Sequence, residues 1–218
     1  VGFSNFKKDI SNSKNILEKM NLSLINRGPD EQGYYINKNV AFGHRRLIVI
    51  DPEGGKQPMI QKYSYGEYVI VYNGQIYNTK ELRKTLEENG FTFKGHSDTE
   101  VLLKSYIHFG NEVVNHLNGI FAFAIWNEHK KELFFARDHF GVKPLFYTIQ
   151  NDTLIFASEI KGIFEYPNVE KILDNQGICE LFGIGPAHTA GTTVFKNIYE
   201  IKPAHFAIFN NSGIHIER

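Results

Sequence analysis

Residues 120–138 read "IFAFAIWNEHKKELFFARD", two apolar arms separated by a short polar run. Both arms contain phenylalanine, which is enriched in strands, and the Asn-Glu-His-Lys-Lys run between them is typical of a turn. Two strands joined by so short a connection pair antiparallel, whereas parallel strands need a much longer crossover. This stretch therefore predicts a β-hairpin and an antiparallel sheet.

The same pattern recurs along the chain. Two or three strands joined by a tight Asn-Lys-Asn turn are predicted at 33–51, further hairpins at 144–158 and 205–217, and a single strand at 67–72. Helical spacing and capping signals predict helices at 9–26, 78–90, 97–110 and 174–185, with a short one at 158–166. Asn78 is the expected N-cap of the second helix, and Ser97 with Glu100 forms an expected capping box for the third. Helices between groups of hairpins indicate an α+β fold.

Composition narrows the class of protein. The 218 residues carry 24 basic and 24 acidic side chains, so the formal net charge is zero. A neutral chain argues against nucleic acid or an anionic membrane as the main partner, because both favour a basic surface. One cysteine, Cys179, fits a reducing compartment, and no apolar run is long enough to span a bilayer. We expect a cytoplasmic protein in which Cys179 is a buried helical residue.

Motifs for common cofactors are absent from the sequence. Neither a phosphate-binding loop of the G-x-x-x-x-G-K-[ST] type nor a G-x-G-x-x-G turn occurs. The nine histidines show no metal-ligand spacing, so no metal site is predicted.

The stretch "VIVYNGQIYN" (69–78) carries the first candidate chemistry. Asn73-Gly74 is the strongest short signal for a hairpin turn, but few residues remain before the next helix to form a partner strand. Alternatively, the Asn73 carboxamide and the Gly74 backbone N–H form an oxyanion hole, since both donate hydrogen bonds and glycine admits a substrate close to the backbone. Both interpretations stay open on these residues alone.

Two charged residues suit the ends of an amino acid. Arg46 is either a surface charge or a clamp for a carboxylate, which an arginine holds with two parallel hydrogen bonds. Asp98 is either a helix-start carboxylate, favoured by the helix dipole, or a partner for a substrate ammonium group. With Asn73 and Gly74 they would bind an amino acid whose side-chain carbonyl is attacked, but the spacing supplies no nucleophile.

The ordered set of motifs resembles a known family. The segments "RGPD", "GHRRLIVID", "QPM", "YNGQIYN", "SDTEVLL", "LNGIFAFAIW", "ARDHFGVKPLFY" and "ASEIKGI" follow one another along the chain. Together they resemble the N-terminal glutaminase domain of glutamine-hydrolysing asparagine synthetases, a class II (N-terminal-nucleophile) glutamine amidotransferase. The resemblance covers almost the whole chain and implies a four-layer αββα sandwich of two mainly antiparallel sheets.

The resemblance also implies roles for individual residues. Arg46 would hold the α-carboxylate of glutamine, and Asp98 its α-ammonium group. Asn73 and Gly74 would form the oxyanion hole, and the backbone at Val49 and Ile50 would line the pocket. In the family an N-terminal cysteine attacks the glutamine carboxamide with its own α-amine as general base. The released ammonia then amidates aspartate on a C-terminal synthetase domain that uses ATP and Mg²⁺.

Two departures from the family pattern are visible. The family opens Met-Cys-Gly-Ile-x-Gly, whereas this sequence opens "VGFSNF", so the cysteine is expected three positions upstream of Val1. Without it, this fragment is expected to be inactive, and Cys179 matches no motif that could replace it. Gln75 stands where the family usually has glutamate, a second partner of the substrate ammonium group. Glutamine keeps an acceptor oxygen but removes one negative charge, which predicts altered recognition of the amine.

Several alternatives remain. The sequence predicts a glutaminase domain over residues 1 to about 195, followed at about 196–218 by a last hairpin leading into an absent ATP-dependent synthetase domain. The expected partners are glutamine and that synthetase domain, with a homodimer left open, and no cofactor is expected in this domain itself. The chain could instead be a degenerate, non-catalytic docking domain, an interpretation that Gln75 favours. It could also be the glutaminase of an amide ligase with another acceptor.

Overall fold

A computed structural model describes residues 1–48, 54–185 and 189–218. Its strands form two six-stranded sheets in which every pair of neighbouring strands is antiparallel. Sheet A has the order β10 (Tyr199–Glu200), β8 (Phe146–Gln150), β9 (Thr153–Ala157), β1 (Gly2–Asn5), β3 (Val40–Arg46), β2 (Glu31–Ile36). Sheet B has the order β12 (Gly213–Glu217), β11 (Phe206–Asn210), β7 (Glu132–Arg137), β6 (Gly119–Asn127), β5 (Gly66–Ile76), β4 (Met59–Tyr63).

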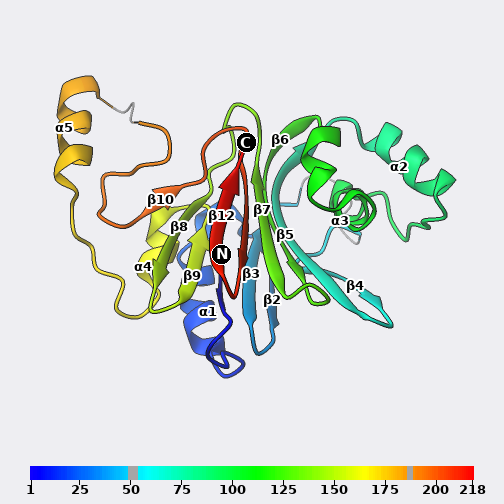
Figure 1. Cartoon of the computed structure of the whole chain (residues 1–218), viewed down its shortest axis with the longest axis horizontal. Coiled ribbons are helices and arrows are strands. Elements are labelled where there is room, and N and C mark those ends of the chain that lie inside the picture. Colours follow the sequence, from blue (N-terminus) through cyan, green and yellow to red (C-terminus); the bar gives the residue numbers. More distant parts are fainter. Residues whose placement is uncertain (49–53, 186–188) are drawn as a thin grey trace.

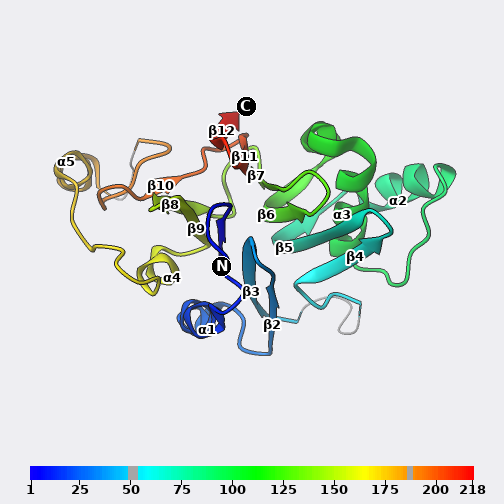
Figure 2. The same ribbon diagram turned by 60° about the horizontal axis from the view of Figure 1, so that its bottom comes forward.

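Helices cover the outer face of each sheet (Figures 1 and 2). Helices α1 (Lys14–Leu22) and α4 (Ile160–Phe164) contact β3 and β9 of sheet A, and a 3-10 turn, Ile25–Arg27, follows α1. Helix α3 (Asp98–Phe109) packs on β5 of sheet B and contacts α2 (Thr79–Glu88), and the 3-10 segment Gly110–His116 follows it. The predicted α+β fold, a four-layer αββα sandwich, is confirmed.

Three apolar clusters hold the four layers together. The middle cluster fills the space between the sheets and includes the fully buried ring of Trp126, with Phe42 and Phe135. Within it the rings of Phe135 and Phe156 meet edge to face, with centroids 4.9 Å apart, so the two sheets interlock through aromatic contacts. The outer clusters join α2 and α3 to sheet B, and α1 and α4 to sheet A. On central strands such as β5, alternating side chains serve two of these clusters: Val69 and Val71 the middle one, Tyr68 and Ile70 an outer one.

Helix α5 (Asn175–Ile184) stands apart from this sandwich (Figure 1). Only its Gly177 is buried, and Cys179 is exposed. The prediction that Cys179 is a buried helical residue is therefore wrong, because an apolar helix need not pack on its own domain. Among the described residues, no helix is long and apolar enough to cross a membrane.

The structure corrects several predicted boundaries. The first helix starts at Lys14 rather than Asp9, because the Ser11 N–H donates to the Asp9 side chain and forms a turn there. The short strands β1 and β4 were not predicted, since each carries only a few residues. Asn78 stands at the predicted N-cap position of α2, but its side chain bonds the backbone of His116 and Asn118 and makes no capping bond to the helix.

The predicted capping box at α3 is half correct. Ser97 caps the helix by accepting the Thr99 N–H at 3.1 Å. Glu100 does not reach back to Ser97; its carboxylate accepts the N–H groups of Lys94 and Gly95 and pairs with buried Lys104 at 2.6 Å. Glu100 thereby fixes the loop that leads into α3.

The "ARDHFGVK" motif forms a hydrogen-bonded loop between β7 and β8, centred on Asp138. Asp138 is 1% exposed, and its carboxylate accepts N–H groups from Phe121, Phe140, Val142 and Lys143 at 2.9–3.2 Å. Burial tends to raise the pKa of Asp138, but these four donors outweigh it and hold the pKa below its usual range. The neighbouring Arg137 donates to three backbone carbonyls and pairs with Glu200 at 2.7 Å.

We expect Asp138→Asn to destabilise the fold. Hydrogen bonds to a charged acceptor contribute about 1.5–3 kcal/mol each, and asparagine keeps one neutral acceptor oxygen of the two, so urea unfolding at pH 7 should show a loss of at least about 2–3 kcal/mol. The pKa of Asp138 is lower in the folded chain than in the unfolded chain. Its contribution is therefore present above the unfolded value of about 3.9 and is lost as the pH falls through the folded value.

The difference in unfolding free energy between Asp138→Asn and the wild type should thus shrink below about pH 4. Asp152→Asn, in the exposed turn between β8 and β9, is the matched control and should stay within about 0.5 kcal/mol of the wild type. A difference that is absent at pH 7, or that persists unchanged in acid, would contradict the role given to Asp138.

Candidate functional site

A pocket of about 570 Å³ lies where the ends of the two sheets meet α3. It is lined by Arg46 from the end of β3, by Asn73, Gly74 and Gln75 from β5, and by Asp98 at the start of α3. The sequence predicted all five as site residues, and the fold brings them to one cavity from segments far apart in the chain. Val49 and Ile50, also predicted for this pocket, lie outside the described residues.

Asn73 and Gly74 belong to a strand and not to a turn. Strand β5 runs on through them to Ile76, and Asn73 pairs with Ala122 and Gly74 with Phe121 on β6. The expectation that the strand ends at Tyr72 is wrong, and the hairpin interpretation falls with it. A Cβ on Gly74 would lie 2.2 Å from the Ile120 carbonyl oxygen, so only glycine lets the strands pair here.

The alternation of β5 decides where Asn73 points. Val69 and Val71 face the space between the sheets, whereas Tyr68 and Ile70 face the helices. Asn73 continues the first series, so its carboxamide lies at the inter-sheet side, in the pocket. Its Nδ2 atom is buried and has no hydrogen-bond partner among the described residues. A buried donor without a partner costs free energy, so the Asn73 Nδ2 is a candidate hydrogen-bond donor to a ligand.

Arg46 is held in place by an acidic partner. Its side chain is 9% exposed, and Nη1 lies 3.0 Å from Oε2 of Glu31, the residue directly opposite it on β2. The "RGPD" motif packs beneath it: Gly28 lies so close to the Arg45–Arg46 backbone that a Cβ would overlap it, at 2.3 Å. A guanidinium carries five N–H donors in a planar fork, a geometry that matches a carboxylate.

Asp98 is oriented by two donors. Its Oδ2 accepts the Tyr72 hydroxyl at 2.8 Å and the Ile76 N–H at 3.3 Å. Asp98 is also the first residue of α3, where the helix dipole favours a negative charge. The two interpretations of Asp98 are therefore compatible, because one residue both starts the helix and lines the pocket.

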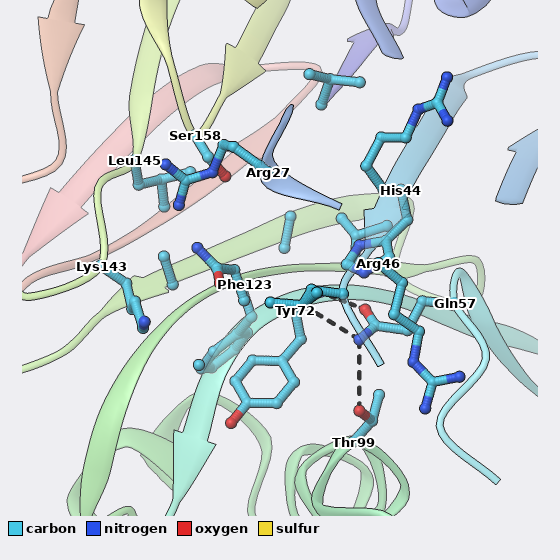
Figure 3. A pocket seen from close by; sticks show the side chains of 18 of the residues that line it. Arg27, His44, Arg46, Gln57, Tyr72, Thr99, Phe123, Lys143, Leu145 and Ser158 are labelled. Atoms are coloured by element: carbon cyan, nitrogen blue, oxygen red, sulfur yellow. Dashed lines mark hydrogen bonds between the residues drawn. The ribbon is translucent and has the colours of Figure 1, made fainter. Parts of the chain in front are cut away.

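Gln57 and Tyr72 are pocket residues that the sequence did not single out individually (Figure 3). The Gln57 side chain exchanges two hydrogen bonds with the Tyr72 backbone, and its Nε2 also reaches Thr99 Oγ1 at 3.5 Å. Gln57 belongs to the "QPM" segment, which carried no predicted role. The only signal in the sequence was a polar side chain in a loop beside an apolar strand.

The other end of the pocket is lined by residues of sheet A and of the loop around Asp138. Lys143 and Leu145 come from the end of that loop, and Arg27 and Ser158 line the wall beyond them (Figure 3). Arg27 pairs with Glu159 of the "ASEIKGI" motif at 3.0 Å. Between these polar groups the wall is apolar, with Val71 and Phe156 on facing sheets. Glu159, a motif residue outside the pocket lining, thus fixes the side chain of Arg27, which lines the pocket.

The charge of the pocket depends on a few groups. His44 lines it, and burial, with cationic groups including Arg46 nearby, lowers the pKa of His44 to about 3. His44 is therefore neutral at physiological pH. Arg46 and Asp98 supply opposite charges at the polar end, and the cationic side chains of Arg27, Arg45 and Lys143 also line the pocket. An amino acid carries the same two charges on neighbouring atoms, so the pocket is complementary to one.

Comparisons with known proteins place the chain in one family. The chain matches the glutamine amidotransferase domain family over residues 1–218. It is 48% identical over 218 residues to asparagine synthetase [glutamine-hydrolyzing] 3 of Bacillus subtilis (strain 168). The aligned region covers 100% of this chain and 36% of that relative. It is 46% identical over 158 residues to asparagine synthetase [glutamine-hydrolyzing] 1 of the same organism, covering 72% of this chain and 25% of the relative.

The chain thus spans about a third or less of the length of these relatives. A solved structure, the glutamine phosphoribosylpyrophosphate amidotransferase of Bacillus subtilis in complex with ADP and GMP, superposes with a TM-score of 0.71. The two chains are 21% identical, and the superposed region covers 100% of this chain and 48% of the solved chain. At this identity the match supports the fold alone. From the family match and the two sequence relatives together, the chain belongs to the glutamine amidotransferase domain family.

Proposed function

We propose that this domain binds glutamine in the pocket at Asp98 and hydrolyses its side-chain amide to glutamate and ammonia. The observation that carries the proposal is the convergence of Arg46, Asn73 and Asp98 on one cavity, with the Asn73 Nδ2 buried and unpartnered among the described residues. Arg46 binds the α-carboxylate and Asp98 the α-ammonium group. The glutamine side chain then extends between the sheets, and its carboxamide oxygen meets Asn73 Nδ2 and the Gly74 N–H.

The nucleophile in this proposal is a cysteine three positions upstream of Val1. Val1 lines the pocket, and β1, which starts at Gly2, occupies the middle of sheet A. Residues that continue the chain upstream of Val1 thus start from the pocket wall. The thiolate attacks the carboxamide carbon, and the α-amine of the cysteine acts as general base. Ammonia leaves as the thioester forms, and water then cleaves the thioester to give glutamate.

During the attack, negative charge develops on the carboxamide oxygen. Asn73 Nδ2 and the Gly74 N–H are fixed before the reaction by the pairing of β5 with β6, so they stabilise this charge without rearranging. Removing one such donor typically lowers kcat by about 100- to 1,000-fold. We therefore expect Asn73→Ala, in a chain that carries the upstream cysteine, to lose about that much glutaminase activity, with only a several-fold weakening of glutamine binding.

We further propose that ammonia serves an ATP- and Mg²⁺-dependent synthetase part of a longer chain that amidates aspartate. The relatives named asparagine synthetase support this, since most of their length lies outside the matched region. On this proposal residues up to about 195 form the glutaminase domain, and residues from about 196 lead towards the synthetase part. The last hairpin nevertheless belongs to sheet B, where β11 pairs with β7. An amide ligase with another acceptor is the second candidate, because the acceptor site lies outside this domain.

Binding of glutamine to this chain can be measured without the nucleophile. Calorimetric titration should give saturable binding in the millimolar range or tighter. Arg46→Met should weaken it by at least about 30-fold, because it removes one partner of a hydrogen-bonded charge pair. Arg46→Lys keeps the charge but not the planar guanidinium, so its affinity for glutamine should lie between those of the wild type and Arg46→Met. Unaltered glutamine binding in Arg46→Met would remove Arg46 from the site, provided that circular dichroism shows a folded variant.

Gln75→Glu tests the departure from the family pattern. Gln75 is an exposed residue at the pocket, two positions beyond Asn73 on the same face of β5. A carboxylate there adds attraction for the substrate ammonium group, which in solvent is worth about 1 kcal/mol or less. We expect glutamine to bind roughly two- to fivefold more tightly, with the gain disappearing in 1 M salt. Equal or weaker binding in low salt would support the degenerate, non-catalytic alternative.

A further inference from the structure

Tyr72 and Gln57 link the segments that carry the proposed glutamine contacts (Figure 3). The Tyr72 hydroxyl donates to Asp98 Oδ2 at 2.8 Å, which connects β5 to the start of α3. The Tyr72 N–H donates to Gln57 Oε1 at 2.6 Å, and Gln57 Nε2 donates to the Tyr72 carbonyl at 3.1 Å. Gln57 therefore pairs with Tyr72 as a neighbouring strand residue would, just before Asn73.

The Tyr72 phenol is a donor at any physiological pH. Its side chain is 5% exposed and belongs to the apolar cluster under α2 and α3. Burial, followed by the Asp98 carboxylate, raises the pKa of Tyr72 well above its usual range. The hydroxyl thus keeps its proton, and the tyrosine ring is fixed by packing around it.

The two donors of Asp98 share one of its carboxylate oxygens. Both hydrogen bonds that Asp98 makes to described residues go to Oδ2, one from Tyr72 and one from the Ile76 N–H. A carboxylate held by two donors on one oxygen presents the other oxygen in a fixed direction. A short side chain at a helix start would otherwise be free to bond the first-turn N–H groups of its own helix.

We propose that Tyr72 and Gln57 are positioning residues with separate tasks. Tyr72 aims Asp98 Oδ1 at the α-ammonium group of the ligand and so sets selectivity for an α-amino acid. Gln57 fixes the backbone that precedes Asn73 and so serves the carboxamide end. This inference rests on the proposed function, because it assigns both residues through their effects on Asp98 and Asn73.

The test compares two ligands that differ in one group. Glutamine and 4-carbamoylbutanoate share the carboxylate and the carboxamide, but the second lacks the α-amine. Each is titrated calorimetrically into this chain as wild type, Tyr72→Phe and Tyr106→Phe. Tyr106 is the matched control: it is a buried tyrosine of the same cluster whose hydroxyl bonds Glu132 at 3.3 Å, away from the pocket. Thermal melting checks that each variant is folded.

We expect the wild type to prefer glutamine over 4-carbamoylbutanoate. Tyr72→Phe should weaken glutamine binding about tenfold, because Asp98 loses the bond that orients it. Binding of 4-carbamoylbutanoate should change less than about twofold, so that the preference collapses. Tyr106→Phe should leave the preference as it is even where it lowers the melting temperature. A merely structural role for Tyr72 would weaken both ligands equally.

The outcomes separate the inference from the function on which it rests. A wild type that binds neither ligand, or both equally, overturns the proposed role of Asp98 and this inference with it. A wild type that prefers glutamine, with the same preference in Tyr72→Phe, overturns the inference alone. A preference lost equally in Tyr106→Phe also overturns it, since the effect would then come from the shared core.

Gln57→Glu tests the second task. Glutamate keeps the acceptor for the Tyr72 N–H but loses the donor to the Tyr72 carbonyl and to Thr99. Both ligands should bind several-fold more weakly, because both carry the carboxamide, and the preference for glutamine should remain. Gln61→Glu on β4, outside the pocket, is the matched control and should bind as the wild type does. Unchanged affinity in Gln57→Glu, or a loss confined to glutamine, would contradict the task assigned to Gln57.

Discussion

The close pairing of β5 with β6 at Gly74 is the constraint on which the site depends. A side chain at this position would overlap the Ile120 carbonyl, so the strand continues beyond Tyr72 only because glycine lacks a Cβ. That continuation keeps the alternation of β5 in register. Asn73 consequently faces the space between the sheets, and Tyr72 faces α3. One glycine thus brings an amide donor and the orienting partner of Asp98 to opposite faces of one strand.

Three ion pairs of buried or partly buried side chains hold segments that lead to the pocket or lie near it. Arg46 pairs with Glu31, Arg137 with Glu200, and Lys104 with Glu100. A buried charge without a partner costs several kcal/mol, so these pairs do not by themselves make the fold more stable than an apolar core would. Instead, each pair fixes the position of a loop, a strand end or a helix start. The hydrogen bonds to Asp138 likewise fix the segment that places Lys143 and Leu145 in the far wall of the pocket.

Much of the fold was predictable from the sequence because its signals are local. Each long hairpin combines two apolar arms with a polar turn, and the helices show regular spacing, so their order and type were correct. The predicted caps were less reliable, since the Asn78 side chain found partners at His116 and Asn118. The ends of the first helix and the short strands β1 and β4 were missed or misplaced. Strand β1 depends on pairing with the distant strands β3 and β9, which no local pattern reports. The start of the first helix is instead set by the local bond from Ser11 to Asp9, and β4 pairs with β5, its neighbour along the chain.

The sequence by itself determined the class of fold, the family resemblance and five pocket residues that the structure describes. It did so because residue types such as arginine, asparagine and aspartate at strand and helix ends carry their chemistry with them. Only the tertiary structure decided between the turn and the strand at Asn73-Gly74, and only it revealed Tyr72, Gln57 and Glu31 as partners of the site. These roles arise from contacts between segments far apart in the chain. Such contacts depend on packing the two sheets together, which spacing along one strand cannot specify.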